Sequence, residues 1–198
     1  MSVVSLLHQK GGTGKSTLAI AAAISYLGAG EKVVLIDADP QGTAGDWGNR
    51  FSAAFGLEVV SHVRPNFPAL VESLRQDWER MVIDGPPSLS PVTESILAAS
   101  DRVIVPVRPS LPDLWSIPWF AAVVKKLRGS GHPLRPLVVF NMHRGEALEP
   151  LHAEISAWNI PAWHEPIPAD EAFPRLFEGV PLPQRLSEMI GRLIADEP

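Results

Sequence analysis

Residues 8–17 read His8-Gln9-Lys10-Gly11-Gly12-Thr13-Gly14-Lys15-Ser16-Thr17, between an apolar run at residues 3–7 and a helix-forming run at residues 18–24. In a loop that joins a strand to a helix, glycines let backbone N–H groups curl around phosphate oxygens, and the helix N-terminus adds its dipole and free donors. Lys15 supplies a positive charge for the β- and γ-phosphates, Ser16 a hydroxyl ligand for magnesium, and Thr17 supports the loop or the nucleotide. The segment therefore predicts a nucleoside triphosphate site whose contacts run from Gly11 to Thr17.

Five more short runs rich in Val, Ile and Leu follow along the chain, separated by helix-like stretches. They lie at residues 33–36, 57–60, 81–83, 103–107 and 137–140. The runs are continuous rather than alternating, which is typical of strands buried on both faces, and their alternation with helices favours parallel strands joined by right-handed crossovers. We predict a three-layer α/β fold, with a mostly parallel central sheet flanked by helices, and a single domain over residues 1–198.

The composition excludes several kinds of site. The chain has 198 residues, 45% of them hydrophobic, no cysteine and a formal net charge of −5. The lack of cysteine excludes a disulfide framework, a thiolate zinc site, a cysteine-held iron–sulfur cluster and a cysteine nucleophile. No apolar stretch approaches the ~18 residues of a membrane-spanning helix, and no basic leader follows Met1, so we expect a cytoplasmic protein.

The phosphate loop departs from the ordinary P-loop pattern at one place. That pattern asks for a glycine five residues before Gly14, where this chain has Gln9, and Lys10 follows it. The string KGGTGKST resembles the deviant Walker A motif of the ParA/MinD family, in which a second lysine precedes the glycines. In that family the lysine reaches across a nucleotide-sandwich dimer to the phosphates of the partner subunit. The resemblance implies this role for Lys10, together with the P-loop NTPase fold and a homodimer formed with ATP.

Two later segments resemble elements of the same family. The string DADPQG at residues 37–42 resembles switch I, which implies that Asp39 orients the attacking water and that Asp37 supports the magnesium shell. The string VIDGPP at residues 82–87 resembles Walker B and switch II, which implies that Asp84 reaches the magnesium through water. Carboxylates at the ends of parallel strands face the ligand crevice. An isolated Asp pair after a strand more often caps a helix, but the residues that follow Asp39 favour the site.

The resemblance continues through residues 105–110, 141–142 and 167–173, and so spans nearly the whole chain. In relatives the last two places flank the adenine ring, which implies base-pocket roles for Asn141, Pro168 and Ala169. For the last two residues, a place in the core is a nearly equal alternative. Gly85 and Arg108 stand where the family usually has other residues. The first exchange changes flexibility more than chemistry, and the role of Arg108 is left open.

Hydrolysis of ATP is the reaction that these residues predict. Phosphoryl transfer needs positioning and charge neutralisation rather than a side-chain nucleophile, so Lys10, Lys15, Mg²⁺ and a water oriented by Asp39 suffice. The sequence gives no sign of the second substrate site that a kinase needs. We therefore expect slow hydrolysis that serves as a timer, with ATP holding two subunits together and its loss releasing them.

A basic segment is the predicted DNA contact. Family members that bind DNA do so as ATP dimers, without sequence specificity, through basic residues outside the nucleotide site. Although the sequence pI is near 5.7, residues 114–145 include no acid and five basic residues: Lys125, Lys126, Arg128, Arg135 and Arg144. Two copies in a dimer would make binding steeply salt-dependent. The alternative is that the first three only complement the C-terminus of a helix.

The predicted function is that of a small ParA-like ATPase associated with the nucleoid. It would position a plasmid, a chromosome region or a protein cargo, with a ParB-like or other adaptor that stimulates hydrolysis. One alternative is a MinD-like regulator that cycles on a membrane. A less favoured alternative is a small-molecule P-loop kinase or ligase, in which Lys10 would have no task that faces a partner.

The last segment of the chain bears on the membrane alternative. It places five apolar residues at helical spacing: Leu186, Met189, Ile190, Leu193 and Ile194. The segment is short, lacks a broad basic face and ends in Asp196-Glu197-Pro198, which an anionic lipid surface would repel. Core packing is therefore favoured over membrane targeting.

Overall fold

A computed structural model of the chain describes residues 1–195; Asp196, Glu197 and Pro198 lie outside the described residues. Within this range six strands form one sheet in the order β3-β2-β4-β1-β5-β6, and every neighbouring pair runs parallel. The strands are β1 (Ser2–Leu6), β2 (Val33–Asp37), β3 (Glu58–Ser61), β4 (Arg80–Asp84), β5 (Arg102–Val107) and β6 (Arg135–Phe140). All six apolar runs are strands, which confirms the predicted α/β fold.

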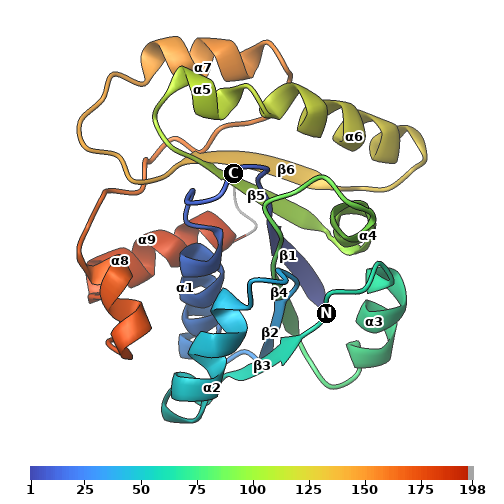
Figure 1. Ribbon diagram of the computed structural model, residues 1–198, viewed down its shortest axis with the longest axis vertical. Helices are drawn as coiled ribbons and strands as arrows, with labels where there is room; N and C mark the ends of the chain where they lie inside the picture. Colours follow the sequence, from blue (N-terminus) through green and yellow to red (C-terminus); the bar gives the residue numbers. More distant parts are fainter. Residues whose placement is uncertain (196–198) are drawn as a thin grey trace.

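Helices cover both faces of the sheet and complete the three layers (Figure 1). One apolar core lies beneath α1 (Lys15–Gly28), α2 (Thr43–Phe55) and α9 (Gln184–Ile194). The second core lies beneath α3 (Phe67–Leu74), α4 (Pro91–Ala99), α5 (Leu111–Leu114), α6 (Ile117–Gly129) and α7 (Glu149–Ser156). Successive residues of a strand point to opposite faces, so Val34 and Leu35 of β2 enter different cores. Two short elements, α8 (Ala172–Arg175) and the 3₁₀ turn η1 (Leu176–Glu178), precede α9.

The strand β3 differs from its prediction. Its continuous apolar run suggests burial on both faces, but Glu58, Val60 and Ser61 are exposed and only Val59 is half-buried. The reason is its position at the edge of the sheet, where it packs against α2 on one side. A Cβ added to Gly48 of α2 would overlap with the Val59 side chain, so the glycine permits this close approach.

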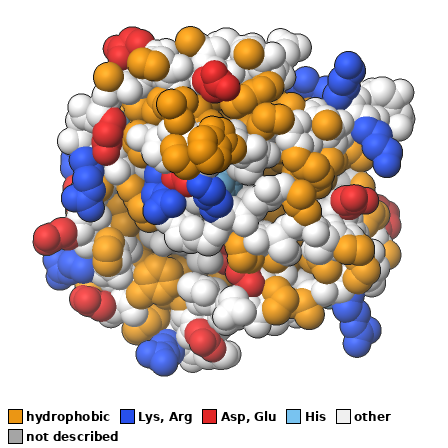
Figure 2. Space-filling model, turned by 45° about the horizontal axis from the view of Figure 1, so that its top comes forward, with side chains coloured by type: hydrophobic (Ala, Val, Ile, Leu, Met, Phe, Trp, Pro, Cys, Tyr) orange, Lys and Arg blue, Asp and Glu red, His pale blue; other side chains and the backbone are white. Residues whose placement is uncertain are grey.

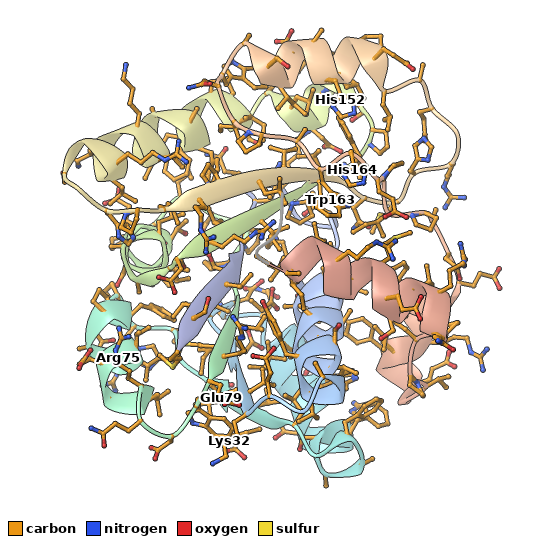
Figure 3. All side chains as sticks on the ribbon, turned by 180° about the vertical axis from the view of Figure 1, so that it is seen from behind. Lys32, Arg75, Glu79, His152, Trp163 and His164 are labelled. Carbon is orange, nitrogen blue, oxygen red and sulfur yellow. The ribbon has the colours of Figure 1, made fainter. Side chains whose placement is uncertain are left out.

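The opposite edge strand, β6, is covered by a later part of the chain. The Val138 N–H donates to the Pro161 carbonyl at 2.9 Å, and the Trp163 N–H donates to the Val138 carbonyl at 2.8 Å. Trp163 lies beside β6 on this returning segment (Figure 3). Further along, the Ala169 N–H donates to the His143 carbonyl at 2.9 Å. The return therefore carries residues 168–169 to the end of β6, where the phosphate loop also lies.

Two helices answer questions that the sequence leaves open. Pro118 stands in the first turn of α6 and begins the helix without kinking it, since proline needs no N–H there. In α9 the five apolar residues at helical spacing are all buried in the first core, which confirms core packing. Among residues 1–195, none of the helices has the length and apolarity that a membrane span requires.

Candidate functional site

The phosphate loop joins β1 to α1 and takes a conformation that depends on glycine. Gly12 has φ 72° and Gly14 has φ 90°, a left-handed region that side chains with a Cβ rarely enter. A Cβ at Gly14 would also overlap with Nδ2 of Asn141. That amide donates instead to the Thr13 carbonyl at 2.8 Å, so β6 braces the loop from the side. The loop thus presents its backbone at the N-terminus of α1, as a phosphate site requires.

The predicted carboxylates meet at this end of the sheet because the strands are in register. Asp84, the last residue of β4, pairs with Leu6 of β1 on one side and with Asp37 of β2 on the other. The phosphate loop and both carboxylates therefore occupy one level, at the carboxyl ends of three adjacent strands. Asp39 follows two residues after Asp37 and is half-buried.

Asp84 is a buried acid at the centre of the site. It is fully buried, and neither of its carboxylate oxygens has a hydrogen-bond partner among residues 1–195. Burial raises the pKa of Asp84 to about 7, against the opposing effects of the nearby Ser16 hydroxyl and the Lys15 ammonium. A buried carboxylate without donors is costly unless a ligand satisfies it. The unpartnered Asp84 carboxylate, with the Ser16 hydroxyl nearby, therefore suits a bound cation.

The carboxylate of Asp37, unlike that of Asp84, accepts hydrogen bonds from the backbone. One of its oxygens accepts the Asp39 N–H at 3.0 Å and the other accepts the Gly45 N–H, in the first turn of α2, at 2.6 Å. Burial raises the pKa of Asp37, while the bond from Gly45 opposes the shift. The helix-capping alternative is thus met in part, because Asp37 satisfies a backbone donor of α2. Its bonds fix the path of the chain that carries Asp39.

Lys15 is the cation inside the site. Its side chain is buried, and its Nζ donates to the Lys10 carbonyl at 3.3 Å. Burial lowers the pKa of Lys15, while Asp84 and Asp39 oppose the shift. Thr13 is also buried, and its Oγ1 has no hydrogen-bond partner among the described residues. A buried ammonium, an unpartnered hydroxyl and an unpartnered carboxylate together suit a charged ligand that brings its own metal ion.

The chemistry of these donors fits magnesium better than a protein-enclosed metal. Within residues 1–195 there is no cluster of three or more His, Cys, Asp or Glu side chains that could hold a metal ion. Mg²⁺ keeps several waters and is usually bound by one or two protein oxygens together with substrate phosphates. The Ser16 hydroxyl and the Asp84 carboxylate are oxygen donors of this kind.

A hollow of about 530 Å³ opens beside Gly14 and Thr17, and the predicted base-pocket residues line it. Asn141, Pro168 and Ala169 all border this hollow, the last two half-buried. Pro168 and Ala169 thus border a hollow and are not enclosed by the sheet and its helices, as the base-pocket prediction expects. The volume lies in the range typical of small-ligand pockets.

Lys10 lies at the rim of the site and is held by residues of its own chain. Its Nζ donates to Oδ1 of Asp113 at 2.8 Å and to the Pro112 carbonyl at 2.6 Å. The sequence prediction missed Asp113, which lies in α5, five residues after Arg108. Arg108 also binds this carboxylate, through Nε at 2.7 Å.

His8 is a second residue that the sequence prediction missed. Its Nδ1 accepts the Lys10 N–H at 3.2 Å, so the neutral ring carries its proton on Nε2, which faces the Ser116 hydroxyl at 2.9 Å. Burial lowers the pKa of His8 to about 4, so the ring is neutral at physiological pH. His8 thereby ties the phosphate loop to the start of α6.

The five basic residues predicted to contact DNA do not form one patch. All five are exposed. Lys125, Lys126 and Arg128 lie at the end of α6, and Arg135 begins β6 at the same end of the sheet. Arg144 follows β6 at the opposite end, where it borders the 530 Å³ hollow. Arg128 Nε donates to the Leu134 carbonyl at 3.0 Å and so fastens the connection between α6 and β6.

Comparison with known proteins gives a family for these features. The model of the "CobQ/CobB/MinD/ParA nucleotide binding domain" family matches residues 4–179. A chromosome-partitioning ATPase Soj of Thermus thermophilus is 32% identical over 177 residues, covering 73% of this chain and 71% of that protein. A "Maintenance of carboxysome distribution protein A" of Gloeobacter kilaueensis is 40% identical over 115 residues, covering 57% of this chain. The chain spans only about half of that second relative, 51% of its length.

Solved structures share the fold at low sequence identity. A variant of McdA from Cyanothece in complex with ATP has a TM-score of 0.79 at 16% identity, covering 100% of this chain and 98% of that one. A cobyrinic acid a,c-diamide synthase from Mycobacterium smegmatis, with a bound ATP analogue and magnesium, has a TM-score of 0.75 at 18% identity, covering 98% of this chain and 94% of that one. These two structures thus share the three-layer arrangement of this chain.

Proposed function

The chain belongs to the CobQ/CobB/MinD/ParA nucleotide-binding family, and we propose that it is a ParA-like ATPase that binds ATP with Mg²⁺ and forms a nucleotide-dependent homodimer. The observation that carries the proposal is the meeting of the buried Lys15 with the unpartnered Asp84 carboxylate beneath a glycine loop. ATP with its metal ion brings both charges that this site lacks. Relatives named for ATP binding and partition add support.

Each residue of the site has a task in this proposal. The backbone of residues 11–14 and the Lys15 ammonium bind the β- and γ-phosphates. Ser16 and Asp84 would hold Mg²⁺, which neutralises phosphate charge when bound. Asp39, on the chain segment fixed by Asp37, orients the attacking water. Asn141, Pro168 and Ala169 enclose the base, which the neighbouring hollow accommodates.

Lys10 is the residue that would contact the second subunit of the proposed dimer. It lies at the rim with a side chain that is 37% exposed, which lets it reach a ligand outside its own loop. In the proposed dimer each Lys10 binds the triphosphate held by the other copy, so ATP joins the subunits and its hydrolysis releases them. The dimer binds DNA without sequence specificity and, with an adaptor protein, positions a cargo on the nucleoid. Partition and carboxysome relatives support a cargo of this kind.

Three alanine variants test the switch. Purified wild type should dimerise in light scattering with a non-hydrolysable ATP analogue and Mg²⁺, and should then be retained on DNA. Lys15→Ala should lose every response to nucleotide, Lys10→Ala should bind nucleotide and stay monomeric, and Asp39→Ala should stay dimeric in ATP. Arg75→Ala is the matched control, since Arg75 lies at the end of α3 (Figure 3), and its Nε pairs with Glu72 on the surface at 3.1 Å.

Two results would contradict the proposal. A wild-type chain that remains monomeric while saturated with the analogue removes the dimer. Equal DNA retention by all variants, whatever nucleotide is added, removes the switch. Turnover by a monomer that rises with an added small-molecule substrate would favour the kinase or ligase alternative.

A further inference from the structure

Arg108, whose role the sequence leaves open, shares a buried carboxylate with Lys10. The Asp113 side chain is 1% exposed and receives both cations. Arg108 donates through Nε to Oδ2 at 2.7 Å and through a terminal nitrogen to Oδ1 at 3.1 Å, while Lys10 donates to Oδ1 at 2.8 Å. The space-filling view in Figure 2 shows basic side chains near the middle of one face of the molecule as well as at its edges.

The charges of these three side chains do not cancel. Burial by itself would raise the pKa of Asp113, but the hydrogen bonds from Arg108 and Lys10 outweigh it and lower that pKa to about 2. The carboxylate is therefore ionised at physiological pH, and one negative charge faces two positive ones. The positive charge of Arg108 by itself neutralises Asp113, and its two hydrogen bonds occupy both carboxylate oxygens.

The state of Asp113 after Lys10 leaves depends on whether Arg108 is present. If Lys10 leaves, Asp113 keeps both bonds from Arg108. If Arg108 were absent, the departure of Lys10 would leave a buried, ionised carboxylate with no cation, which is strongly unfavourable. Lys10 would then be bound to its own chain as a neutral pair. Both cations reach solvent, with side chains 37% and 48% exposed, and they border a hollow of about 590 Å³.

We propose that Arg108 is a positioning residue for Lys10: by neutralising Asp113, it leaves the Lys10 charge available for a phosphate of the nucleotide bound to a second copy of this chain. The inference rests on the proposed dimer and assigns it a regulator. Asp113 holds the lysine at the rim, and Arg108 sets how readily the lysine exchanges that carboxylate for a triphosphate.

The first test measures how much non-hydrolysable ATP analogue is needed for half-maximal dimerisation, by light scattering at fixed Mg²⁺ and protein concentration. Arg108→Gln should raise this concentration by about threefold, the effect of a partly exposed ion pair. Arg108→Lys should stay near wild type, because a lysine still neutralises Asp113. Arg75→Gln is the matched control and should change nothing. Binding of the analogue by the monomer should be the same in all four chains.

The second test is a rescue that a merely structural role of Arg108 would not produce. Adding Asp113→Asn to Arg108→Gln removes the competing charge, so the double variant should dimerise at lower analogue concentration than Arg108→Gln alone. If the double variant is no better than the single one, or if Arg108→Lys fails as Arg108→Gln does, the proposal is overturned. The second result would mean that Arg108 itself contacts the partner.

A direct probe of Lys10 separates this inference from the proposed function. Acylation of Lys10 by an amine-reactive ester, followed by mass spectrometry without nucleotide, should be slower in Arg108→Gln than in wild type and faster in Asp113→Asn. If wild type fails to dimerise, the proposed function fails while this readout still tests the three-residue contact. If wild type dimerises but neither the reactivity nor the analogue concentration responds to Arg108→Gln, the inference alone fails.

Discussion

At the scale of single residues, Asp84 links the stability of the fold to its ligand. The folded chain retains the Asp84 proton up to a pH of about 7, whereas the ordinary value is 3.8. The folded state therefore binds more protons than the unfolded state between these values, so the free energy of unfolding falls as pH rises through this range. The ionised Asp84 carboxylate therefore lowers the free energy of unfolding of the ligand-free chain, and a bound cation would offset this cost.

Asp84→Asn should accordingly stabilise the chain in the absence of nucleotide. We expect a gain of about 1–3 kcal/mol at pH 8, seen as a rise of several degrees in Tm, and little gain at pH 4. The exposed Asp77→Asn is the control and should show no such pH dependence. With ATP and Mg²⁺ the order should reverse, because only wild type gains from the ligand. A lower Tm for Asp84→Asn at pH 8 would contradict the argument.

Packing, rather than backbone flexibility, explains why residue 85 is a glycine. A Cβ there would overlap with Cδ2 of Leu7 and lie 3.0 Å from the Leu6 carbonyl oxygen. Leu7 is 2% exposed and cannot move into solvent. Gly85→Ala should therefore destabilise the chain by about 1–3 kcal/mol in thermal or urea unfolding. Gly28→Ala, with no heavy atom within 4 Å of the added Cβ, is the control; equal effects of the two would refute the steric explanation.

At the scale of elements, α9 shows why helical periodicity alone does not identify a membrane helix. Its apolar side is buried against α1, and the Tyr26 hydroxyl donates to the Ile194 carbonyl at 3.0 Å. We expect Leu193→Ala to lower the free energy of unfolding by about 2–4 kcal/mol, as for other buried leucines. Arg192→Ala, which removes only a surface pair with Glu165, should cost less than about 1 kcal/mol.

The same burial makes a prediction about membranes. Because the apolar side of α9 is not free, the chain should not co-sediment with vesicles of anionic phospholipid, with or without ATP. Retention on vesicles only in ATP would mean that α9 leaves the core, and would favour the membrane-cycling alternative.

At the scale of the whole molecule, four of the five predicted DNA-contact residues lie at one end of the sheet, and the nucleotide site lies at the other. If the end of α6 is the DNA surface, a dimer presents it twice, and the logarithm of affinity should fall steeply with the logarithm of salt concentration. Lys125→Ala with Lys126→Ala should reduce that slope by up to about four, one for each lost contact in the dimer. Arg144→Ala, at the other end, should leave the slope unchanged. If only Arg144→Ala reduced this slope, the DNA surface would instead lie at the end of the sheet that holds the nucleotide site.

Most of the fold could be predicted from the sequence because strands buried on two faces leave continuous apolar runs, and because a parallel sheet needs helices between them. The exception, β3, has the composition of a central strand and the position of an edge strand. Strand order is not written in any local run, so exposure at residues 58–61 could not be predicted. For the site, Lys15 and Ser16 follow one predicted strand and Asp84 ends another, so all three could be predicted from local sequence patterns.

The amino-acid sequence by itself determined which chemical groups the site contains. These are a glycine-rich loop, whose left-handed backbone needs glycine, a lysine and a hydroxyl within that loop, and carboxylates at strand ends. These features depend on neighbours in the chain, so a string of ten residues specifies them. The tertiary structure alone decided which side chains that are distant in the chain form ion pairs. Lys10 and Asp113 are 103 residues apart, and they meet because β1 and β5 are adjacent in the sheet. Only strand order brings a second cation to that buried carboxylate.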